Sequence, residues 1–535
     1  MKRLLFLLCL IPALCVSQKP KLVVGIVVDQ MCYEYLYRFQ PHFGDGGFKK
    51  LMHHGISCAN TLYNYVPTVT GPGHASIYTG TTPANHGIVG NEWYDRKNQT
   101  MVNCVFDPTV QSVGALSEKG KASPHRLETY TITDQLKLTY PASKVFSMSI
   151  KDRGAILPGG HLSDGSYWLD ASSGTFISSS YYDPALPDWL VAFNQSNHAQ
   201  RYFRSWELLH AKSAYINSTD DSPYEKRINN KLSPTFPYEF TKENWLNYFT
   251  MTPSANTLLT DLALATLEKE NLGKDQHTDM LCISYSTPDI VGHTFGPYSM
   301  EIEDLYARLD LELTRLFTYI SKNIGDRESL IFLTADHAVV PVPQQLVDLR
   351  LPGGYFDLSE VLKQLKLKQQ ETFGTSLIAY HSDMNLYWNI PVIDSLKYSL
   401  SEVNQHAISF LSTFPEIKAI CTKEELMGSQ QSDPWKGMIQ RGFQPHRNGD
   451  LVFILKPGYL GIEDGDPFAH QGTTHGSCYN YDTHVPLLWY GNGLKPKTIY
   501  RSIDIPDIAA TLVHFLEIQR TGGMTGKPIV EVLRR

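Results

Sequence analysis

The chain has 535 residues, too many for one small domain and enough for a large enzyme core with insertions. Hydrophobic residues make up 42% and charged residues 19%, which excludes a disordered chain and a coiled-coil rod. The net charge of −7 argues against nucleic acid as the main partner, because proteins that bind its phosphate backbone need a basic surface. It still allows a small phosphate ester to be held by a few local cations.

The first 17 residues resemble a secretory signal peptide, because Lys2 and Arg3 precede the apolar run Leu4–Val16. This run is too short to span a bilayer, and no later segment has the 18 consecutive apolar residues of a transmembrane helix. We therefore expect a secreted or periplasmic protein without a transmembrane segment. The alternatives are a buried N-terminal helix and a lipoprotein signal with Cys15 as the lipidated residue.

Six cysteines follow this predicted leader and form no CxxC pair, which argues against a cysteine-based zinc site. They are Cys32, Cys58, Cys104, Cys282, Cys421 and Cys478. An exported chain could join some of them in disulfides, but the sequence does not reveal the pairing.

Five short apolar runs rich in β-branched residues are typical of buried strands in a parallel sheet. They are Leu22–Val28, Lys144–Ile150, Met280–Ser286, Ser329–Thr334 and Val485–Tyr490. Between them, apolar residues at three-and-four spacing predict a helix over Glu301–Ile320. The alternation predicts an α/β fold with a mainly parallel central sheet flanked by helices. Its site should lie beyond the carboxyl ends of the strands.

Two stretches interrupt the alternation. Residues about 155–255 are rich in Ser, Tyr, Asn, Asp and Pro, and residues about 345–465 mix helical and strand patterns. Because no Gly/Ser or Pro run separates either stretch, we expect both to be insertions that cap the site within one catalytic domain spanning 18–535. The sequence does not define the oligomeric state, and a monomer is compatible with it.

Residues that often bind metals follow several of these strands. Asp289 and His293 lie four residues apart after the third run, and Asp336 with His337 follows the fourth. Each pair alone could be a buried Asp–His pair, and Asp29 after the first run could simply cap a helix.

Together with a late histidine, these residues supply three carboxylates and three imidazoles. The set is Asp29, Asp289, His293, Asp336, His337 and His475. Divided in two, it would form adjacent metal sites whose mixed ligands suit zinc. Paired metal sites are a recurring solution for phosphoryl transfer, because two ions can stabilise the attacking and the leaving oxygen together.

Thr70 is a candidate nucleophile, since it precedes small residues and a predicted helix. At a helix N-terminus the backbone N–H groups and the helix dipole favour a bound anion, and a metal could activate the hydroxyl. The alternative is an ordinary threonine N-cap.

Lys151 and Arg153 are candidate donors to a phosphoryl group, because they stand two residues apart at the end of the second run. Strand alternation would point both side chains the same way. The alternative is a role in surface salt bridges. Asn91 is a further donor candidate, although Asn is common in turns.

In this order the motifs resemble the alkaline phosphatase superfamily, and most of all the bacterial phosphate-irrepressible alkaline phosphatases, which are relatives of the nucleotide pyrophosphatase/phosphodiesterase branch. The motifs are Asp29, Thr70 in TVTGPGHASIYTG, Asn91 in HGIVGN, Lys151-Asp152-Arg153, Asp289 with His293, Asp336-His337 and His475 in THGS. The resemblance covers nearly the whole chain after the leader.

The resemblance implies an exported two-zinc alkaline phosphatase. One zinc would be bound by Asp289, His293 and His475, and the other by Asp29, Asp336, His337 and the Thr70 oxygen. Thr70 would attack phosphorus and form a phosphothreonine, while Asn91, Lys151 and Arg153 hold the non-bridging oxygens. His484 competes with His475 for the last ligand position, but the THGS context favours His475. His74, His86 and His470 are expected to be structural or surface residues.

Three alternatives to a phosphate monoesterase would each need different features in the sequence. A phosphodiesterase or nucleotide pyrophosphatase would use the same metals, but it needs room for a second ester group and gains little from two cations. Lys151 and Arg153 therefore favour small phosphate monoesters as substrates. A sulfatase would need an oxidisable Cys or Ser at position 70, and a non-catalytic binder would have lost a ligand or the nucleophile.

Overall fold

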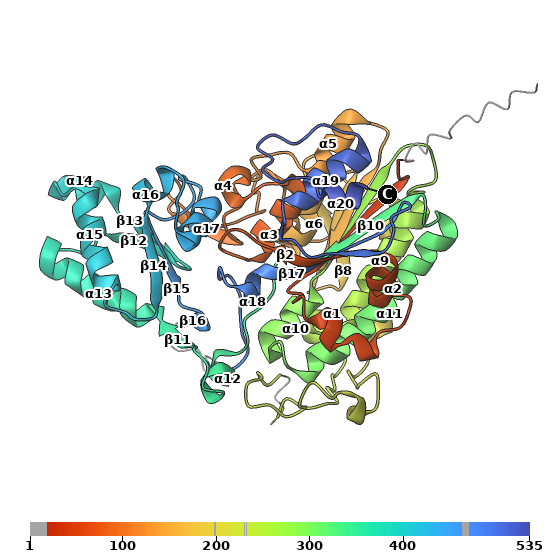
Figure 1. The fold of residues 1–535 in the computed structure, drawn as a ribbon, viewed down its shortest axis with the longest axis horizontal. Coiled ribbons are helices and arrows are strands. Elements are labelled where there is room, and N and C mark those ends of the chain that lie inside the picture. Colours follow the sequence, from red (N-terminus) through yellow and green to blue (C-terminus); the bar gives the residue numbers. More distant parts are fainter. Residues whose placement is uncertain (1–18, 197–198, 229–230, 232, 463–469, 535) are drawn as a thin grey trace, which may run out of the picture.

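The computed structural model describes residues 19–196, 199–228, 231, 233–462 and 470–534, so the predicted leader lies outside the described residues. Its centre is a large mixed sheet with helices on both faces (Figure 1), as the α/β prediction requires. In sheet order the strands are β18 (Lys497–Ile499), β2 (Ile56–Leu62), β17 (His484–Gly491), β10 (Ser329–Thr334), β1 (Leu22–Val28), β9 (Asp279–Tyr285), β6 (Val145–Ser149), β7 (Gly165–Asp170), β8 (Thr175–Ser179) and β5 (Ser112–Val113). A further strand, β19 (Ile503–Asp504), pairs with β2.

The middle of the sheet is parallel, since β10, β1, β9, β6 and β7 run in one direction. Every residue of β1 and β9 is buried, which explains their continuous apolar sequences. The last predicted strand, β17, differs from the prediction because it runs antiparallel to β10 and β2. A strand covered on both faces has the same apolar pattern in either direction, so its sequence did not reveal this orientation.

Two groups of helices cover the sheet (Figure 1). One group contains α2 (Phe48–His54), α9 (Pro253–Lys269), α10 (Thr287–Phe295) and α11 (Met300–Asn323), and the other α3 (Thr70–Thr79), α5 (Ile132–Thr139), α6 (Asp152–Gly159) and α19 (Asp507–Leu516). The predicted helix over Glu301–Ile320 is the central part of α11. It begins after Ser299, whose hydroxyl accepts the N–H of Ile302 at 3.3 Å.

Residues 358–455 form a region with its own core, at the left of Figure 1. Its antiparallel sheet has the strand order β12 (Ile378–Ser382), β13 (Asn385–Trp388), β15 (Leu451–Leu455) and β14 (Ile417–Thr422). Its helices are α13 (Leu358–Phe373), α14 (Ile390–Leu396), α15 (Leu400–Leu411), α16 (Lys423–Met427) and α17 (Pro434–Gly442). Leu365, Leu386 and Phe453 lie in that core.

The stretch 155–255 divides into two parts. Its first part supplies β7 and β8, which extend the central sheet. Serines interrupt the apolar pattern of these strands, so the sequence did not predict them. Inside the fold the serine hydroxyls have hydrogen-bond partners: those of Ser147 and Ser166 are buried and lie 2.7 Å apart. The part after β8 has short helices in its described residues, among them α7 (Asp188–Gln195), which packs against β8, and α8 (Trp245–Tyr248). Its irregular stretch, coloured olive, lies below α10 and α11 in Figure 1.

The remaining α-helices and strands of the described chain are short. They are α1 (Tyr35–Arg38), α4 (Pro83–His86), α12 (Pro343–Asp348), α18 (Asn480–Thr483), α20 (Val530–Leu533), the hairpin of β3 (Glu92–Asp95) with β4 (Thr100–Asn103), and the parallel pair of β11 (Gly354–Asp357) with β16 (Tyr459–Ile462). The six cysteines of the described residues are buried and free. Within the same residues, no helix has both the length and the apolar character needed to cross a membrane.

Candidate active site

Three aspartates meet at the carboxyl edge of the sheet because their strands are neighbours. Asp29 follows β1 directly, Asp336 comes two residues after β10, and Asp289 lies in α10, just after β9. The strand order β10-β1-β9 places the three side by side, and each is at most 4% exposed. This is the edge at which α/β sheets bind their ligands.

Asp289 has two histidines around one of its oxygens. Its Oδ1 lies 3.2 Å from Nε2 of His293, one turn further along α10, and 3.3 Å from Nε2 of His475. His475 comes from the loop before α18. The structure therefore places both predicted histidine ligands beside Asp289, whereas the residues whose ligand atoms lie within 4.8 Å of one another here are Asp289, His337 and His475.

The second predicted set also converges. His337 Nε2 lies 3.4 Å from Asp29 Oδ1 and 3.7 Å from Asp336 Oδ2. The imidazole also stacks on His475, with ring centroids 3.5 Å apart, and its ligand atoms lie within 4.8 Å of those of Asp289 and His475. His337 thus belongs with Asp29 and Asp336 and also borders the first set.

The backbone holds each of these imidazoles in one orientation. Nδ1 of His293 donates to the Thr473 carbonyl and Nδ1 of His475 to the Thr68 carbonyl, both at 2.8 Å. In His337 the same nitrogen donates to the carbonyl of Ala338 at 3.0 Å. With the proton on Nδ1, every Nε2 keeps its lone pair toward the carboxylates, which is the usual arrangement of metal-binding histidines.

Several atoms of this cluster are buried without a hydrogen-bond partner among the described residues: Asp29 Oδ1, Asp336 Oδ2 and His337 Nε2. Burial, followed by the charges of Asp289 and Asp336, raises the pKa of the Asp29 carboxyl. Burial, followed by His337, lowers the pKa of His475 to about 3, so its imidazole is neutral. Burial opposes the charge on His337, but Asp336 and then Asp29 raise the pKa of its imidazole to about 9, so it holds a second proton at neutral pH, which a bound cation would replace. Buried carboxylate oxygens beside imidazole nitrogens fit divalent cations such as zinc.

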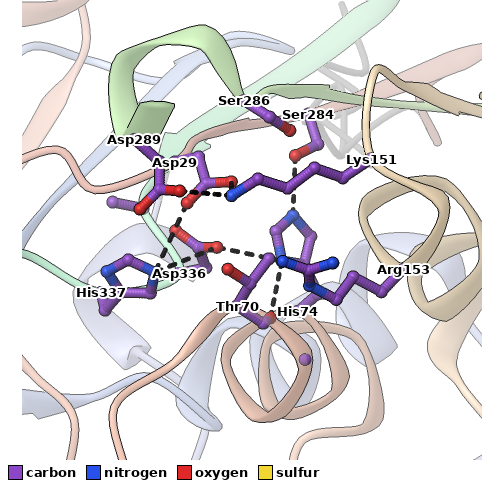
Figure 2. Close-up of polar contacts among 12 residues, drawn as sticks. Asp29, Thr70, His74, Lys151, Arg153, Ser284, Ser286, Asp289, Asp336 and His337 are labelled. Atoms are coloured by element: carbon purple, nitrogen blue, oxygen red, sulfur yellow. Dashed lines mark hydrogen bonds and ion pairs between the residues drawn. The ribbon is translucent and has the colours of Figure 1, made fainter. Parts of the chain in front are cut away.

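Thr70 is the first residue of α3, as predicted, but it is not the cap. The N-cap is Val69, which makes no capping bond. The start of α3 packs directly on the strand end: a Cβ added to Gly73 would lie 2.2 Å from the Asp336 carbonyl oxygen. Figure 2 shows the Thr70 side chain beside Asp336. Glycine at position 73 therefore permits the approach of the candidate nucleophile to the carboxylates.

Lys151 connects the two ligand sets. Its Nζ lies 2.7 Å from Asp29 Oδ2 and 2.5 Å from Asp289 Oδ2. The Nε atom of Arg153 is buried without a hydrogen-bond partner among the described residues. Figure 2 shows both side chains reaching toward the aspartates and Thr70 from the same side. Two fixed cations thus accompany the acidic cluster.

Lys151 and Arg153 both reach the site, but from the start of a helix and not from the end of a strand as predicted. β6 ends at Ser149, Lys151 is the N-cap of α6, and Arg153 lies in the first turn of that helix. A helix start therefore orients them. Asn91 accepts the N–H of Gly71, in the first turn of α3, at 2.7 Å on its Oδ1, and this bond leaves its amide NH₂ group as the donor.

Sequence reasoning missed several residues that position the cluster. His74 was expected to be structural, yet its Nδ1 lies 2.9 Å from the Thr70 carbonyl and 3.2 Å from Asp336 Oδ2. The Gln30 side chain donates to Asp289 Oδ1 at 2.7 Å. Asp482 accepts the N–H of Ser477 at 2.8 Å and so fixes the loop after His475. The contacts of His74 with Asp336 and of Gln30 with Asp289 join distant segments, so no sequence spacing signals them.

The other histidines lie away from the ligand atoms. His484, the rival for the last ligand position, donates from Nε2 to the Ala59 carbonyl at 3.0 Å and stacks on Tyr33. His86 is buried against Ser76, and His470 packs on Tyr355.

A cavity of about 700 Å³ adjoins the cluster. On one side it is lined by Val69 and the loop from Thr474 to Cys478, and on the other by strands of the region 358–455, including Tyr380 and Met384. The region 358–455 therefore forms one wall of the cavity beside the cluster.

The chain as a whole is similar to a known protein family and to several of its members. Residues 23–477 match the model of the type I phosphodiesterase / nucleotide pyrophosphatase family. The chain is 38% identical to the alkaline phosphatase PafA of Elizabethkingia meningoseptica, over 97% of this chain and 95% of the relative. It is also 38% identical to the alkaline phosphatase PhoV of Synechococcus elongatus, over 96% and 93%. A crystal structure of wild-type PafA superposes with a TM-score of 0.91 at 37% identity, covering 96% of this chain and 99% of that chain.

Proposed function

This chain belongs to the type I phosphodiesterase / nucleotide pyrophosphatase family, and we propose that it is an alkaline phosphatase that hydrolyses phosphate monoesters through a phosphothreonine. Its full-length similarity to PafA and PhoV supports the alkaline phosphatase activity. The observation that carries the choice of substrate is the pair of cationic side chains, Lys151 and Arg153, beside Thr70.

Thr70 is the nucleophile in this proposal. Its oxygen attacks phosphorus, the bond from phosphorus to the ester oxygen breaks, and the leaving group departs with the electron pair. Water then cleaves the bond between phosphorus and the Thr70 oxygen, which releases phosphate and restores the hydroxyl. The N-terminus of α3 favours the negative charge that gathers on the phosphoryl group during both steps.

Lys151 and Arg153 distinguish a monoester from a diester. A monoester carries one more anionic oxygen, and two fixed cations stabilise that charge most where it is greatest. Asn91, oriented by its bond to Gly71, supplies a neutral donor. A diesterase would instead need space for a second ester group, from which it would gain binding energy.

We assign one zinc ion to Asp289, His293 and His475 and a second to Asp29, Asp336, His337 and the Thr70 oxygen. Bound there, zinc would act as a Lewis acid toward the phosphoryl oxygens and favour the ionised form of the threonine hydroxyl. The unpaired buried carboxylate oxygens and the fixed Nδ1 protons support this assignment.

We further propose that residues 1–17 direct export to the periplasm or the exterior, and that residues 18–535 form one catalytic domain. The region 358–455 and the segment after β8 would then cap the site. In this assignment the cavity of about 700 Å³ takes the leaving group of small phosphate esters.

Initial rates test the substrate class. The mature enzyme, with its zinc content measured, is assayed with an aryl phosphate and with the corresponding bis-aryl phosphate. We expect the monoester to be hydrolysed faster by a wide margin. A diester rate equal to or above the monoester rate would overturn the proposal.

A further inference from the structure

His74 is a buried histidine to which the proposed reaction gives no role. It lies in α3, one turn after Thr70, and is 0% exposed. Its Nδ1 lies 2.9 Å from the carbonyl oxygen of Thr70 and 3.2 Å from Oδ2 of Asp336. Its Nε2 lies 2.8 Å from the hydroxyl of Ser284, in β9. One imidazole therefore connects the start of the nucleophile's helix, a predicted metal ligand and a strand of the central sheet (Figure 2).

The neighbours of this imidazole determine where its proton lies. Both atoms near Nδ1, the carbonyl oxygen of Thr70 and the carboxylate oxygen of Asp336, can only accept a hydrogen bond. Nδ1 therefore carries a proton, which it donates to the Thr70 carbonyl. Nε2 faces a hydroxyl, which can donate to it, so the neutral ring satisfies both of its nitrogens and Ser284 selects the tautomer.

The Oδ2 atom of Asp336 remains available to a cation in this arrangement. It is buried without a hydrogen-bond partner among the described residues, although the Nδ1 atom of His74 lies near it. The proton of His74 points to the Thr70 carbonyl instead. The N–H group thus attracts the carboxylate through its partial positive charge and leaves the lone pairs of Oδ2 for a metal ion.

A second buried histidine shows what is particular to His74. His86, in α4, is also 0% exposed, and its Nε2 lies 2.9 Å from the hydroxyl of Ser76. Its Nδ1 accepts the N–H of Ile88 at 3.1 Å, so the proton of this ring lies on Nε2. Neither partner is a candidate ligand or nucleophile. His86 therefore holds only the fold together, whereas His74 contacts both a candidate ligand and the nucleophile's backbone.

We propose that His74 is a positioning residue that holds Thr70 and Asp336 at the spacing with which they bind one zinc ion together. This inference rests on the proposed function, in which both residues bind the same ion. The imidazole joins α3 to the segment after β10 at the point where Gly73 lets the helix approach Asp336. Because the ring is buried and bonded at both nitrogens, it cannot turn away from either residue. Side chains that orient metal ligands in this way contribute about 10–100-fold to metal affinity or activity.

Two amide variants test the proposal, because they place their NH₂ group at different points. The amide nitrogen of His74→Asn is as many bonds from Cα as Nδ1 is, so it can still donate to the Thr70 carbonyl. In His74→Gln the amide nitrogen takes the place of Nε2, beside Ser284. Zinc affinity is measured by competition with a chelator, and kcat with an aryl phosphate at saturating zinc. We expect His74→Gln to bind one of its two zinc ions at least about tenfold more weakly and to lose kcat, whereas His74→Asn keeps most of both.

His86→Gln is the matched control, since it also removes a buried imidazole bonded to a serine. It should lower the unfolding temperature, but leave zinc affinity and kcat unchanged. The proposal is overturned if His74→Gln binds zinc as the wild type does, if His74→Asn is impaired as much as His74→Gln, or if His86→Gln weakens zinc binding equally. Chelator competition needs no substrate, so these outcomes are independent of the monoester and diester rates that test the proposed function.

A measurement on the wild type keeps the test decisive if His74→Gln folds poorly. Nitrogen NMR of the zinc-loaded enzyme with labelled histidine, with the His74 signal identified by its loss in His74→Asn, reports which ring nitrogen carries a proton. We expect the proton on Nδ1, as its two acceptor neighbours require. An Nδ1 without a proton would overturn the proposal, because His74 could then hold neither Thr70 nor Asp336.

Discussion

The edge of the central sheet and the region beside α11 both gather buried carboxylates, but they hold them in different ways. In the second region, Glu225 lines a small cavity and Glu301 lies in the first turn of α11. At the sheet edge, Asp29, Asp289 and Asp336 stand among imidazoles whose Nδ1 protons are fixed by backbone carbonyls, with Lys151 between them. Beside α11, Glu301 accepts from the Tyr238 phenol, and no histidine is among the described residues that line the cavity with Glu225. The difference teaches that the donor set, rather than the number of acids, decides whether a cluster suits zinc.

The largest expected effect is that of Thr70→Ala, which removes the nucleophile from the first region. Turnover of the aryl phosphate should fall by at least about three orders of magnitude, while the zinc content stays unchanged. Steady-state rates and elemental analysis measure both. A variant that keeps substantial turnover would contradict the role given to Thr70.

The double variant Lys151→Ala/Arg153→Ala should lose about 100-fold or more in monoester kcat/KM and clearly less in diester kcat/KM, because the extra oxygen of the monoester loses its donors. Lys137→Ala is the control: it removes a lysine that pairs with Asp164 away from the site. Equal losses on both substrates would show that the two cations do not select the monoester.

Gly73→Ala should push the start of α3 away from Asp336, because the new Cβ would lie 2.2 Å from the Asp336 carbonyl oxygen. We expect a loss of about 1–3 kcal/mol in the free energy of unfolding, as for other overpacked positions, together with reduced kcat. Gly522→Ala, where an added Cβ meets nothing within 4 Å, is the control. Unchanged stability and kcat in Gly73→Ala would refute the close approach.

The smallest expected effect is a change of folding stability with pH that arises from Glu301 in the second region. Burial raises the pKa of Glu301 from 4.5 to about 8, so the folded chain keeps a proton that the unfolded chain has released. The contribution of Glu301 to stability should therefore decrease as the pH rises from about 4.5 to about 8. Glu225 acts in the same direction, and Asp220, Asp221, Asp304 and Tyr238 are other groups that face the pair.

Unfolding temperatures across this interval measure the effect. The wild type should lose more stability with rising pH than Glu301→Gln does. Parallel pH profiles for the two proteins would contradict the raised pKa of Glu301.

Much of the catalytic region could be predicted, because its ligands follow strands that are recognisable from their apolar runs. Asp29 and Asp336 needed only the rule that sites lie at the carboxyl ends of parallel strands. The direction of β17 could not be predicted, since burial on both faces removes the alternation that marks a strand's surroundings. The start of α6 was not predicted either. Lys151 and Arg153 were expected at the site because of strand alternation, but the beginning of this helix is what orients them.

The second region gave no sequence signal. Glu225 lies in a polar segment and Glu301 at the start of an amphipathic helix, where an acidic residue is common for reasons of capping and dipole. Their meeting depends on how the segment after β8 packs on α11, which no local pattern encodes. His74 was missed for the same reason, since its contact with Asp336 joins two distant parts of the chain.

Counting zinc in three proteins tests the contrast between the two regions most directly. Elemental analysis of the wild type, saturated with zinc and freed of excess ions, should find two zinc ions per chain. His475→Ala should lose zinc, whereas Glu225→Gln should keep both zinc ions. A wild type that holds no zinc, or a Glu225→Gln variant that loses zinc as His475→Ala does, would contradict the account of one region built for zinc and one that gathers acids without binding it.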